Sequence, residues 1–160
     1  MVKVKVKDSL ETVRKLRLLS GAGVMDCRRA LEKSKGNLNQ AFKVLQEEGE
    51  AIAAKKADRK TEEGLVASYI HVNGRMGAMV MLLCETDFVA RTVDFKNLAH
   101  ELAMQVAAMD PASIEELLAQ EYIKDSKLKI RDLVKQMITK TGENIRIGKF
   151  IRMVVDNSSD

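Results

Sequence analysis

Residues 65–84 have the sequence LVASYIHVNGRMGAMVMLLC, and this stretch decides the fold. Residues 65–72 are mainly apolar, with Ser68 and His71 as the polar residues, and residues 78–84 are apolar throughout. Between the two runs lies Asn73-Gly74, a dipeptide that tolerates the positive φ angles of tight turns. Two strand-like runs joined by such a turn are typical of an antiparallel β-hairpin. The stretch therefore predicts two paired strands.

The residues after this hairpin predict helices and then one more strand. A helical period occurs over residues 95–109 and again over 130–138, and Asp110-Pro111 and Gly142 provide the stop signals. Ser113 followed by Glu116 forms a capping-box pattern. Alternating apolar residues predict a final strand, namely Ile145, Ile147, Ile151, Met153 and Val155. The fold class is therefore α+β: a small antiparallel three-stranded sheet packed with helices.

The first third of the chain predicts three short helices. The first has an apolar stripe of Leu10, Val13, Leu16 and Leu19, with Asp8 or Ser9 as its N-cap, and ends at Gly21-Ala22-Gly23. The second would bury Cys27, Ala30 and Leu31, and the third would bury Ala41, Phe42 and Leu45 before ending at Gly49. Residues 50–60 are alanine-rich and then charged, which favours a short connector helix. We expect a helical domain over residues 1–57, an α+β core over 58–160, and a frayed tail from Asp156.

Composition limits the class of protein. The 160 residues carry a formal charge of +4, but basic residues alternate with acidic ones along most of the chain, and aromatic residues make up only 4%. Without aromatic residues between the basic ones, there is no stacking platform for nucleic acid, so solvated helix faces are the better interpretation. Met1–Lys7 lacks the apolar middle of a signal peptide, no run is long enough to span a bilayer, and two cysteines are too few for a disulfide scaffold. We expect a soluble, cytoplasmic protein with reduced thiols.

The sequence contains no pattern that indicates catalysis. His71 and His100 have no ligand pair at zinc spacing, and neither a phosphate-binding loop nor a nucleophile elbow occurs. Cys27 and Cys84 lie among apolar neighbours and are interpreted as structural. We therefore expect no catalytic residues, no metal, no cofactor and no enzyme activity.

The segment Glu85-Thr-Asp-Phe-Val-Ala-Arg91 is unusual, because it holds one of only four Phe residues between an apolar strand and an amphipathic helix. In one interpretation Phe88 folds back into the core while Thr86 or Asp87 caps the following helix. In the other, a rigid loop presents Phe88 beside a carboxylate for insertion into a partner's pocket, where an aromatic ring supplies buried area. The pattern alone leaves both open.

Two segments resemble the signatures of one family: Ser20-Gly-Ala-Gly-Val-Met-Asp-Cys-Arg-Arg-Ala-Leu31 and Cys84-Glu-Thr-Asp-Phe-Val-Ala-Arg91. Gly142-Glu-Asn-Ile145 is similar to a third, weaker element. The chain resembles elongation factor Ts, the guanine-nucleotide exchange factor for elongation factor Tu, over roughly residues 9–155. Each of the first two motifs is fairly specific, and together, in this order, they are strongly so.

The resemblance implies a fold and a set of contacts. Residues 1–57 would form a three-helix domain similar to ubiquitin-associated domains. The segment Thr86, Asp87, Phe88 and Val89 would enter elongation factor Tu near its nucleotide and magnesium, with Asp87 and Phe88 as the disrupting pair. Arg17, Val24 and Met25 would contact the same GTPase domain, although many members carry Met where this chain has Val24.

The resemblance also implies an oligomeric state. Long members carry two core repeats and an inserted helical hairpin, whereas here only residues 122–128 separate the last two helices. This is similar to a short form in which two chains pair, and strand residues 79–83 are apolar on both faces. We expect a homodimer that binds elongation factor Tu and contacts neither nucleic acid nor membrane directly. A helical adaptor and a basic RNA-binding module are the alternative functions.

Overall fold

The computed structural model describes residues 10–155. The expected N-caps Asp8 and Ser9, the segment 1–7 and the expected tail 156–160 lie outside the described residues. The chain divides into two compact units. The first consists of the described part of Met1–Ala57 together with Lys135–Gly142, and the second of Asp58–Val134 with the described part of Glu143–Asp160. The functional division into domains 1–57 and 58–160 stays a prediction.

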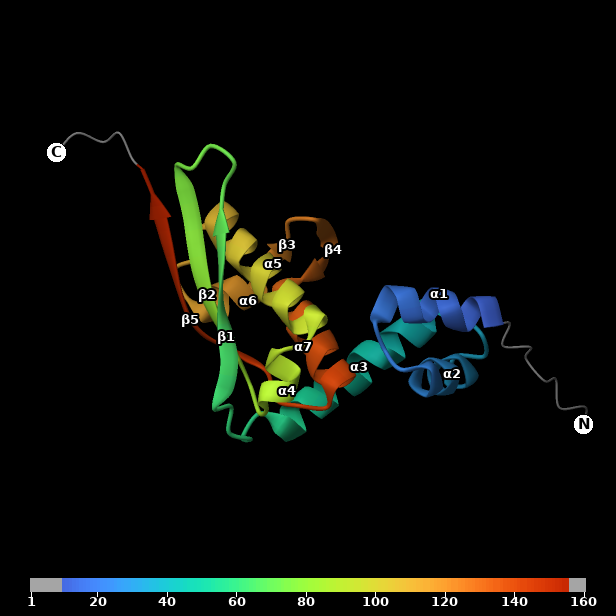
Figure 1. Ribbon diagram of the computed structural model, residues 1–160. Helices are drawn as coiled ribbons and strands as arrows, with labels where there is room; N and C mark the ends of the chain where they lie inside the picture. Colours follow the sequence, from blue (N-terminus) through green and yellow to red (C-terminus); the bar gives the residue numbers. More distant parts are fainter. Residues whose placement is uncertain (1–9, 156–160) are drawn as a thin grey trace, which may run out of the picture. The chain divides into compact units, whose positions relative to one another are not determined.

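The second unit is built on a three-stranded antiparallel sheet in the order β1-β2-β5 (Figure 1). The strands are β1 (Glu63–Ile70), β2 (Met76–Cys84) and β5 (Arg146–Val154). The hairpin prediction is confirmed, since β1 and β2 pair from Glu63 opposite Cys84 to Ile70 opposite Gly77. In the turn, Gly74 has φ +68° and its N–H donates to the His71 carbonyl at 2.7 Å.

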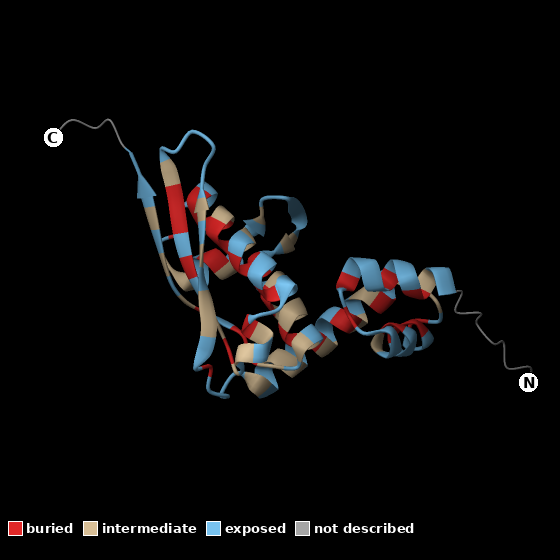
Figure 2. Ribbon diagram, viewed as in Figure 1, coloured by how far each residue is buried: buried red, intermediate tan, exposed pale blue. Residues whose placement is uncertain are grey.

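Helix α5 (Val93–Met109) lies against one face of this sheet, and the buried residues of β2 lie next to it (Figures 1 and 2). The side chain of Thr92 caps α5 by accepting the N–H of Phe95 at 3.3 Å. The second unit also contains α4 (Asp87–Ala90), α6 (Ile114–Ala119), β3 (Glu121–Tyr122) and β4 (Asp125–Lys129). Helix α7 (Ile130–Thr141) starts in this unit, and its residues from Lys135 onwards belong to the first. The core contains Val80, Leu82, Phe95, Leu98, Leu102 and Val106, all buried. The predicted α+β class is confirmed.

The last strand departs from the predicted alternation. A register shift falls where Ile147 lies opposite Leu82 and Lys149 lies opposite Met81, so Gly148 is an extra residue on β5. A bulge of one residue moves every later side chain to the other face of the sheet. Ile147 is therefore buried, whereas Ile151 and Met153 are exposed on the face away from α5. The predicted final strand is confirmed, and the bulge at Gly148 divides its apolar residues between the two faces of the sheet.

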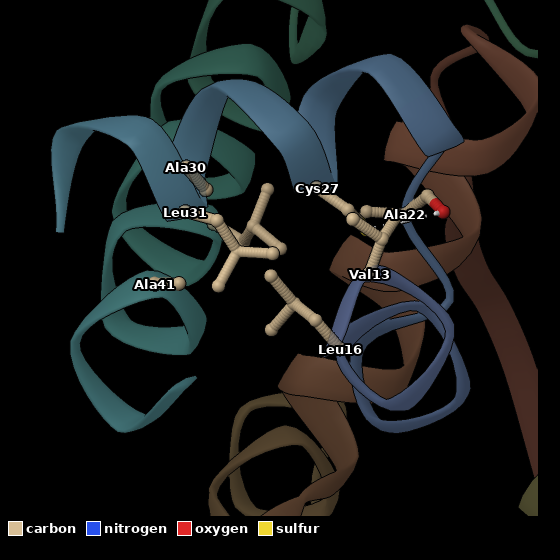
Figure 3. Packing of buried hydrophobic residues seen from close by; sticks show 8 residues of the cluster. Val13, Leu16, Ala22, Cys27, Ala30, Leu31 and Ala41 are labelled. Carbon is tan, nitrogen blue, oxygen red and sulfur yellow. Dashed lines mark hydrogen bonds between the residues drawn. The ribbon is translucent and has the colours of Figure 1, made fainter. Parts of the chain in front are cut away.

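The first unit contains the helices α1 (Leu10–Ser20), α2 (Val24–Lys33) and α3 (Leu38–Lys56). Their shared core is shown in Figure 3 and consists of Val13, Leu16, Ala22, Cys27, Ala30, Leu31, Ala41 and Leu45. The α1 stripe was wrong at both ends, because Leu10 is 90% exposed and Leu19 is also exposed. On a helix of about 3.6 residues per turn, a side chain three residues further along points about 60° away from the first one. Leu10 and Leu19 are three such steps apart, so they point in opposite directions.

The predicted stop at Gly49 was also wrong. Helix α3 continues through Gly49 to Lys56, and the expected connector helix is its last part. Gly49 is buried within α3, and a Cβ atom there would lie 3.2 Å from Thr139 Oγ1 of α7. The glycine thus allows close packing of the two helices. From the sequence pattern alone, a glycine with this role cannot be distinguished from a glycine that ends a helix.

Candidate functional site

Residues Thr86, Asp87, Phe88 and Val89, which we call the TDFV turn, follow β2 directly and form the start of the one-turn helix α4. Thr86 is the N-cap, with φ −128° and ψ 154°, and its hydroxyl oxygen accepts the N–H of Val89 at 3.5 Å. The Thr86 carbonyl accepts the N–H of Ala90 at 3.3 Å and the thiol of Cys84 at 3.2 Å. The turn therefore has a defined local geometry at both ends.

Phe88 points into solvent from this turn. Its side chain is 80% exposed, whereas Ala90 is buried and Val89 is half-buried. Because consecutive residues of a helix are about 100° apart, burying Ala90 directs Phe88 away from the core. The interpretation that folded Phe88 into the core was wrong, although Thr86 does cap the helix. Asp87 is half-buried and pairs with Arg91 at 2.8 Å.

The side chain of Glu143, which comes directly after the α7 C-terminal glycine, holds the beginning of the turn. Its Oε2 accepts the N–H groups of Glu85 at 3.1 Å and Thr86 at 3.0 Å, and its Oε1 accepts the Thr86 hydroxyl at 2.5 Å. In return, Glu85 Oε1 accepts the N–H of Asn144 at 2.6 Å and lies 3.5 Å from Arg59 Nη1. The two segments thus hold each other through reciprocal carboxylate–amide bonds.

Sequence reasoning missed Glu143. The motif Gly142–Ile145 was singled out by resemblance alone, and no role followed for its carboxylate. The contact joins residues 57 positions apart, so no local pattern could reveal it. The predicted C-cap at Gly142 is confirmed, because it has φ +76° and its N–H donates to the Ile138 carbonyl at 2.9 Å.

Cys84 lies beneath the turn, and its thiol is protected from ionisation. Burial, reinforced by the negative charge of Glu143, raises the pKa of Cys84 from 9.0 to about 11. A raised pKa means that the folded protein keeps a proton that the unfolded chain loses. Its contribution to stability is therefore complete below pH 9.0 and is lost as the pH rises towards about 11.

We expect this titration to appear in unfolding experiments. Between pH 8 and pH 11, the free energy of unfolding in urea should fall by about 1–2 kcal/mol more for the wild type than for Cys84→Ala. The reason is that a shift of one pKa unit corresponds to about 1.4 kcal/mol. The measurement is the free energy of unfolding of both proteins at each pH. Parallel pH profiles for the two proteins would contradict the expectation.

The three predicted N-terminal contact residues are all exposed. Arg17 lies on α1, and Val24 and Met25 form the first turn of α2, where Gly23 is the N-cap. Val24 and Met25 are large apolar side chains left in solvent, and Leu18 on α1 is exposed as well. These residues belong to the first unit and the TDFV turn to the second.

Two kinds of feature are absent from residues 10–155. No three His, Cys, Asp or Glu side chains there are grouped as metal ligands would be. None of the helices in the same range combines the length and the apolar character needed to cross a bilayer.

Comparison with known proteins identifies the family of the chain. Residues 85–159 match the family model described as "Elongation factor TS". Elongation factor Ts of Thermotoga neapolitana is 39% identical over 190 aligned positions, which cover 92% of this chain and 96% of that protein. The chain belongs to the elongation factor Ts family. It is accordingly a translation elongation factor, and the family membership expected from the motifs is confirmed.

Other elongation factor Ts sequences show how the chain compares in length. That of Fervidobacterium nodosum is 37% identical and is covered over 98% of its length. That of a Nostoc species is 43% identical over 94% of this chain but only 48% of its own length. The 190 positions aligned with the Thermotoga protein exceed the 160 residues of this chain, so that elongation factor Ts contains residues that this chain lacks.

Proposed function

We propose that this elongation factor Ts homologue is a guanine-nucleotide exchange factor, which binds elongation factor Tu–GDP and promotes GDP release by disturbing the Mg²⁺ and phosphate site. The observation that supports the proposal most is the exposure of the aromatic side chain of Phe88. It lies on a turn that is capped by Thr86 and held by hydrogen bonds to Glu143. A soluble protein gains free energy by burying such a ring, so its exposure favours a role in binding.

The proposed mechanism needs a wedge rather than an acid or a base. Phe88 would insert between helices of the GTPase domain, and Asp87 would accompany it as a carboxylate near the cation site. Mg²⁺ neutralises phosphate oxygens and demands near-ideal octahedral geometry, so a small displacement of its ligands weakens nucleotide binding. By linkage, GDP must weaken the binding of the exchange factor by the same ratio.

Stopped-flow fluorescence tests this function directly. Elongation factor Tu loaded with a fluorescent GDP analogue is mixed with unlabelled GDP and increasing amounts of this protein. We expect the release rate to rise with protein concentration and then to saturate. A release rate that stays at its spontaneous value at all concentrations would overturn the proposed function.

Arg17, Val24 and Met25 are proposed as a second contact with the GTPase domain. Two exposed apolar side chains and a guanidinium offer burial together with a charge-assisted hydrogen bond. A contact remote from the nucleotide should affect complex formation more than the release step. Met25→Ala should therefore raise the concentration for half-maximal release, while the saturating rate changes little.

We also propose that two copies pair through the sheet face opposite α5. That face exposes apolar side chains from all three strands: Val66, Ile70, Met79, Met81, Ile151 and Met153. Met79 lies opposite Ile151 and Met81 lies opposite Val66. A groove of about 270 Å³ is lined by Ile70, Met79, Ile151 and Met153. A second copy fits this surface best, because a two-fold axis places the same apolar side chains against each other and two sheets pack well face to face.

The oligomeric state is measured by light scattering at micromolar concentration. The wild type should have twice the 17.9 kDa mass of one chain. Met79→Arg should give the mass of one chain, because an unpaired buried charge costs several kcal/mol. Ile123→Arg, in the β3–β4 turn, is the matched control and should leave the dimer intact. A wild type that is strictly monomeric would rule out the pairing.

A further inference from the structure

The conformation of the TDFV turn needs support from outside the turn. Helix α4 has only four residues, and a single helical turn is unstable alone because nucleation costs more than its few hydrogen bonds return. Exposure of Phe88 adds to this instability, since burying its ring would be favourable. Other contacts must therefore keep the turn in the observed conformation.

Those contacts converge on Thr86. Its N–H and hydroxyl both donate to the Glu143 carboxylate, its hydroxyl oxygen also accepts the Val89 N–H, and its carbonyl accepts from Ala90 and Cys84. Every polar group of Thr86 thus has a partner. The only acceptor among these partners is the side chain of Glu143, which therefore links the turn to the segment after α7.

We propose that Glu143 is a positioning residue for nucleotide exchange: it fixes the TDFV turn in the conformation that presents Phe88 to the GTPase. This inference rests on the proposed exchange function and goes beyond it, because Glu143 itself need not touch the partner. Glu85 completes the arrangement from the other side, since its carboxylate accepts the Asn144 N–H at 2.6 Å.

The chemistry of the contact explains why a carboxylate is present. Two N–H groups and one hydroxyl point at Glu143, and an ionised carboxylate is an acceptor at both oxygens. A glutamine could accept both N–H groups with its oxygen and donate its NH₂ to the Thr86 hydroxyl oxygen. An alanine would lose all three bonds and leave both N–H groups without this partner.

The first test compares these two substitutions in the GDP-release assay. Glu143→Ala should lower the second-order rate constant for release by about tenfold or more, since hydrogen bonds to a charged group are among the stronger ones and three are lost. Glu143→Gln should stay within about threefold of the wild type, because it can keep the bonds without the charge. Equal activity of Glu143→Ala and wild type would overturn the proposal.

A double-mutant cycle with Phe88→Ala separates positioning from general stability. If Glu143 acts through Phe88, then Glu143→Ala should change the release rate by less than about twofold once Phe88 is already Ala. A merely structural role would give the same tenfold loss in both backgrounds, and that result would overturn the proposal.

Glu101→Ala is the matched control. Glu101 accepts the Tyr122 hydroxyl at 2.5 Å and Lys124 Nζ at 2.7 Å, so its removal also breaks carboxylate bonds, but those of the β3–β4 hairpin rather than those of the TDFV turn. We expect this variant to accelerate GDP release from elongation factor Tu to within about twofold of the wild-type rate. A tenfold loss in this variant would show that any broken carboxylate contact lowers exchange, which overturns a specific role for Glu143.

Amide hydrogen exchange in the free, full-length protein gives a readout that does not need the GTPase. In Glu143→Ala the amides of Glu85 and Thr86 should exchange at least tenfold faster than in the wild type, because local opening governs their protection. Unchanged protection would overturn the positioning role even if release slows. If the wild type itself fails to accelerate GDP release from elongation factor Tu, the proposed function is wrong. The amide exchange data still decide in that case whether Glu143 holds the turn.

Discussion

Phe88→Ala should lower the second-order rate constant for GDP release by about 30-fold or more. Truncating an aromatic hot-spot residue costs about 2 kcal/mol or more, and about 1.4 kcal/mol corresponds to a factor of ten. The free protein should lose almost nothing, because the ring is 80% exposed and contributes little to the folded state. The measurements are stopped-flow release and urea unfolding of the same preparation.

Val93→Ala provides the control for this substitution. Val93 is also apolar and is 71% exposed, and it lies in the first turn of α5, shortly after the TDFV turn. Val93→Ala should therefore accelerate GDP release from elongation factor Tu to within about twofold of the wild-type rate. Equal losses in the two variants would assign the effect to general apolar exposure in this region. A Phe88→Ala protein with wild-type exchange would remove the wedge from the mechanism.

Phe95→Ala should destabilise the protein by about 3–5 kcal/mol, the usual range for removing a buried aromatic ring. Phe95 is fully buried in the first turn of α5 and is the largest of the fully buried side chains among the described residues. Folded domains are stable by only about 5–15 kcal/mol, so the variant should unfold well below the wild-type urea midpoint.

The corresponding control is again in the first turn of α5. Val93→Ala should shift the free energy of unfolding by less than about 0.5 kcal/mol, because its side chain is exposed. Unfolding of both variants is followed by circular dichroism in urea. A loss of less than about 1 kcal/mol in Phe95→Ala would mean that the space left by the ring is refilled, against the close packing of α5 on the sheet.

Local sequence patterns predicted the elements whose causes are local. The hairpin at Asn73-Gly74, the cap at Ser113 and the left-handed Gly142 each follow from a few neighbouring residues. The errors have a different origin. Gly49 lies inside a helix, where the absence of a side chain leaves room for Thr139, 90 positions away in sequence. Gly148 is an extra residue in the pairing of β5 with β2, and it moves the later residues of β5 to the other face.

The same distinction applies to the candidate site. The TDFV turn and its cap at Thr86 were predictable, since they depend on residue types in order along the chain. The exposure of Phe88 was not, because it depends on Ala90 occupying the buried side of α4. Glu143 could not have been predicted at all by periodicity, since its partners lie at the end of a different strand.

The long sequence separation between Glu143 and Thr86 has a consequence for biosynthesis. Chains emerge from the ribosome N-terminus first, and contacts between distant residues form late because closing a long loop costs entropy. The TDFV turn is complete in the nascent chain well before residue 143 has been made. It therefore acquires its holding carboxylate only once residue 143 has been made, so a chain truncated before this residue carries the motif without the contact that holds it.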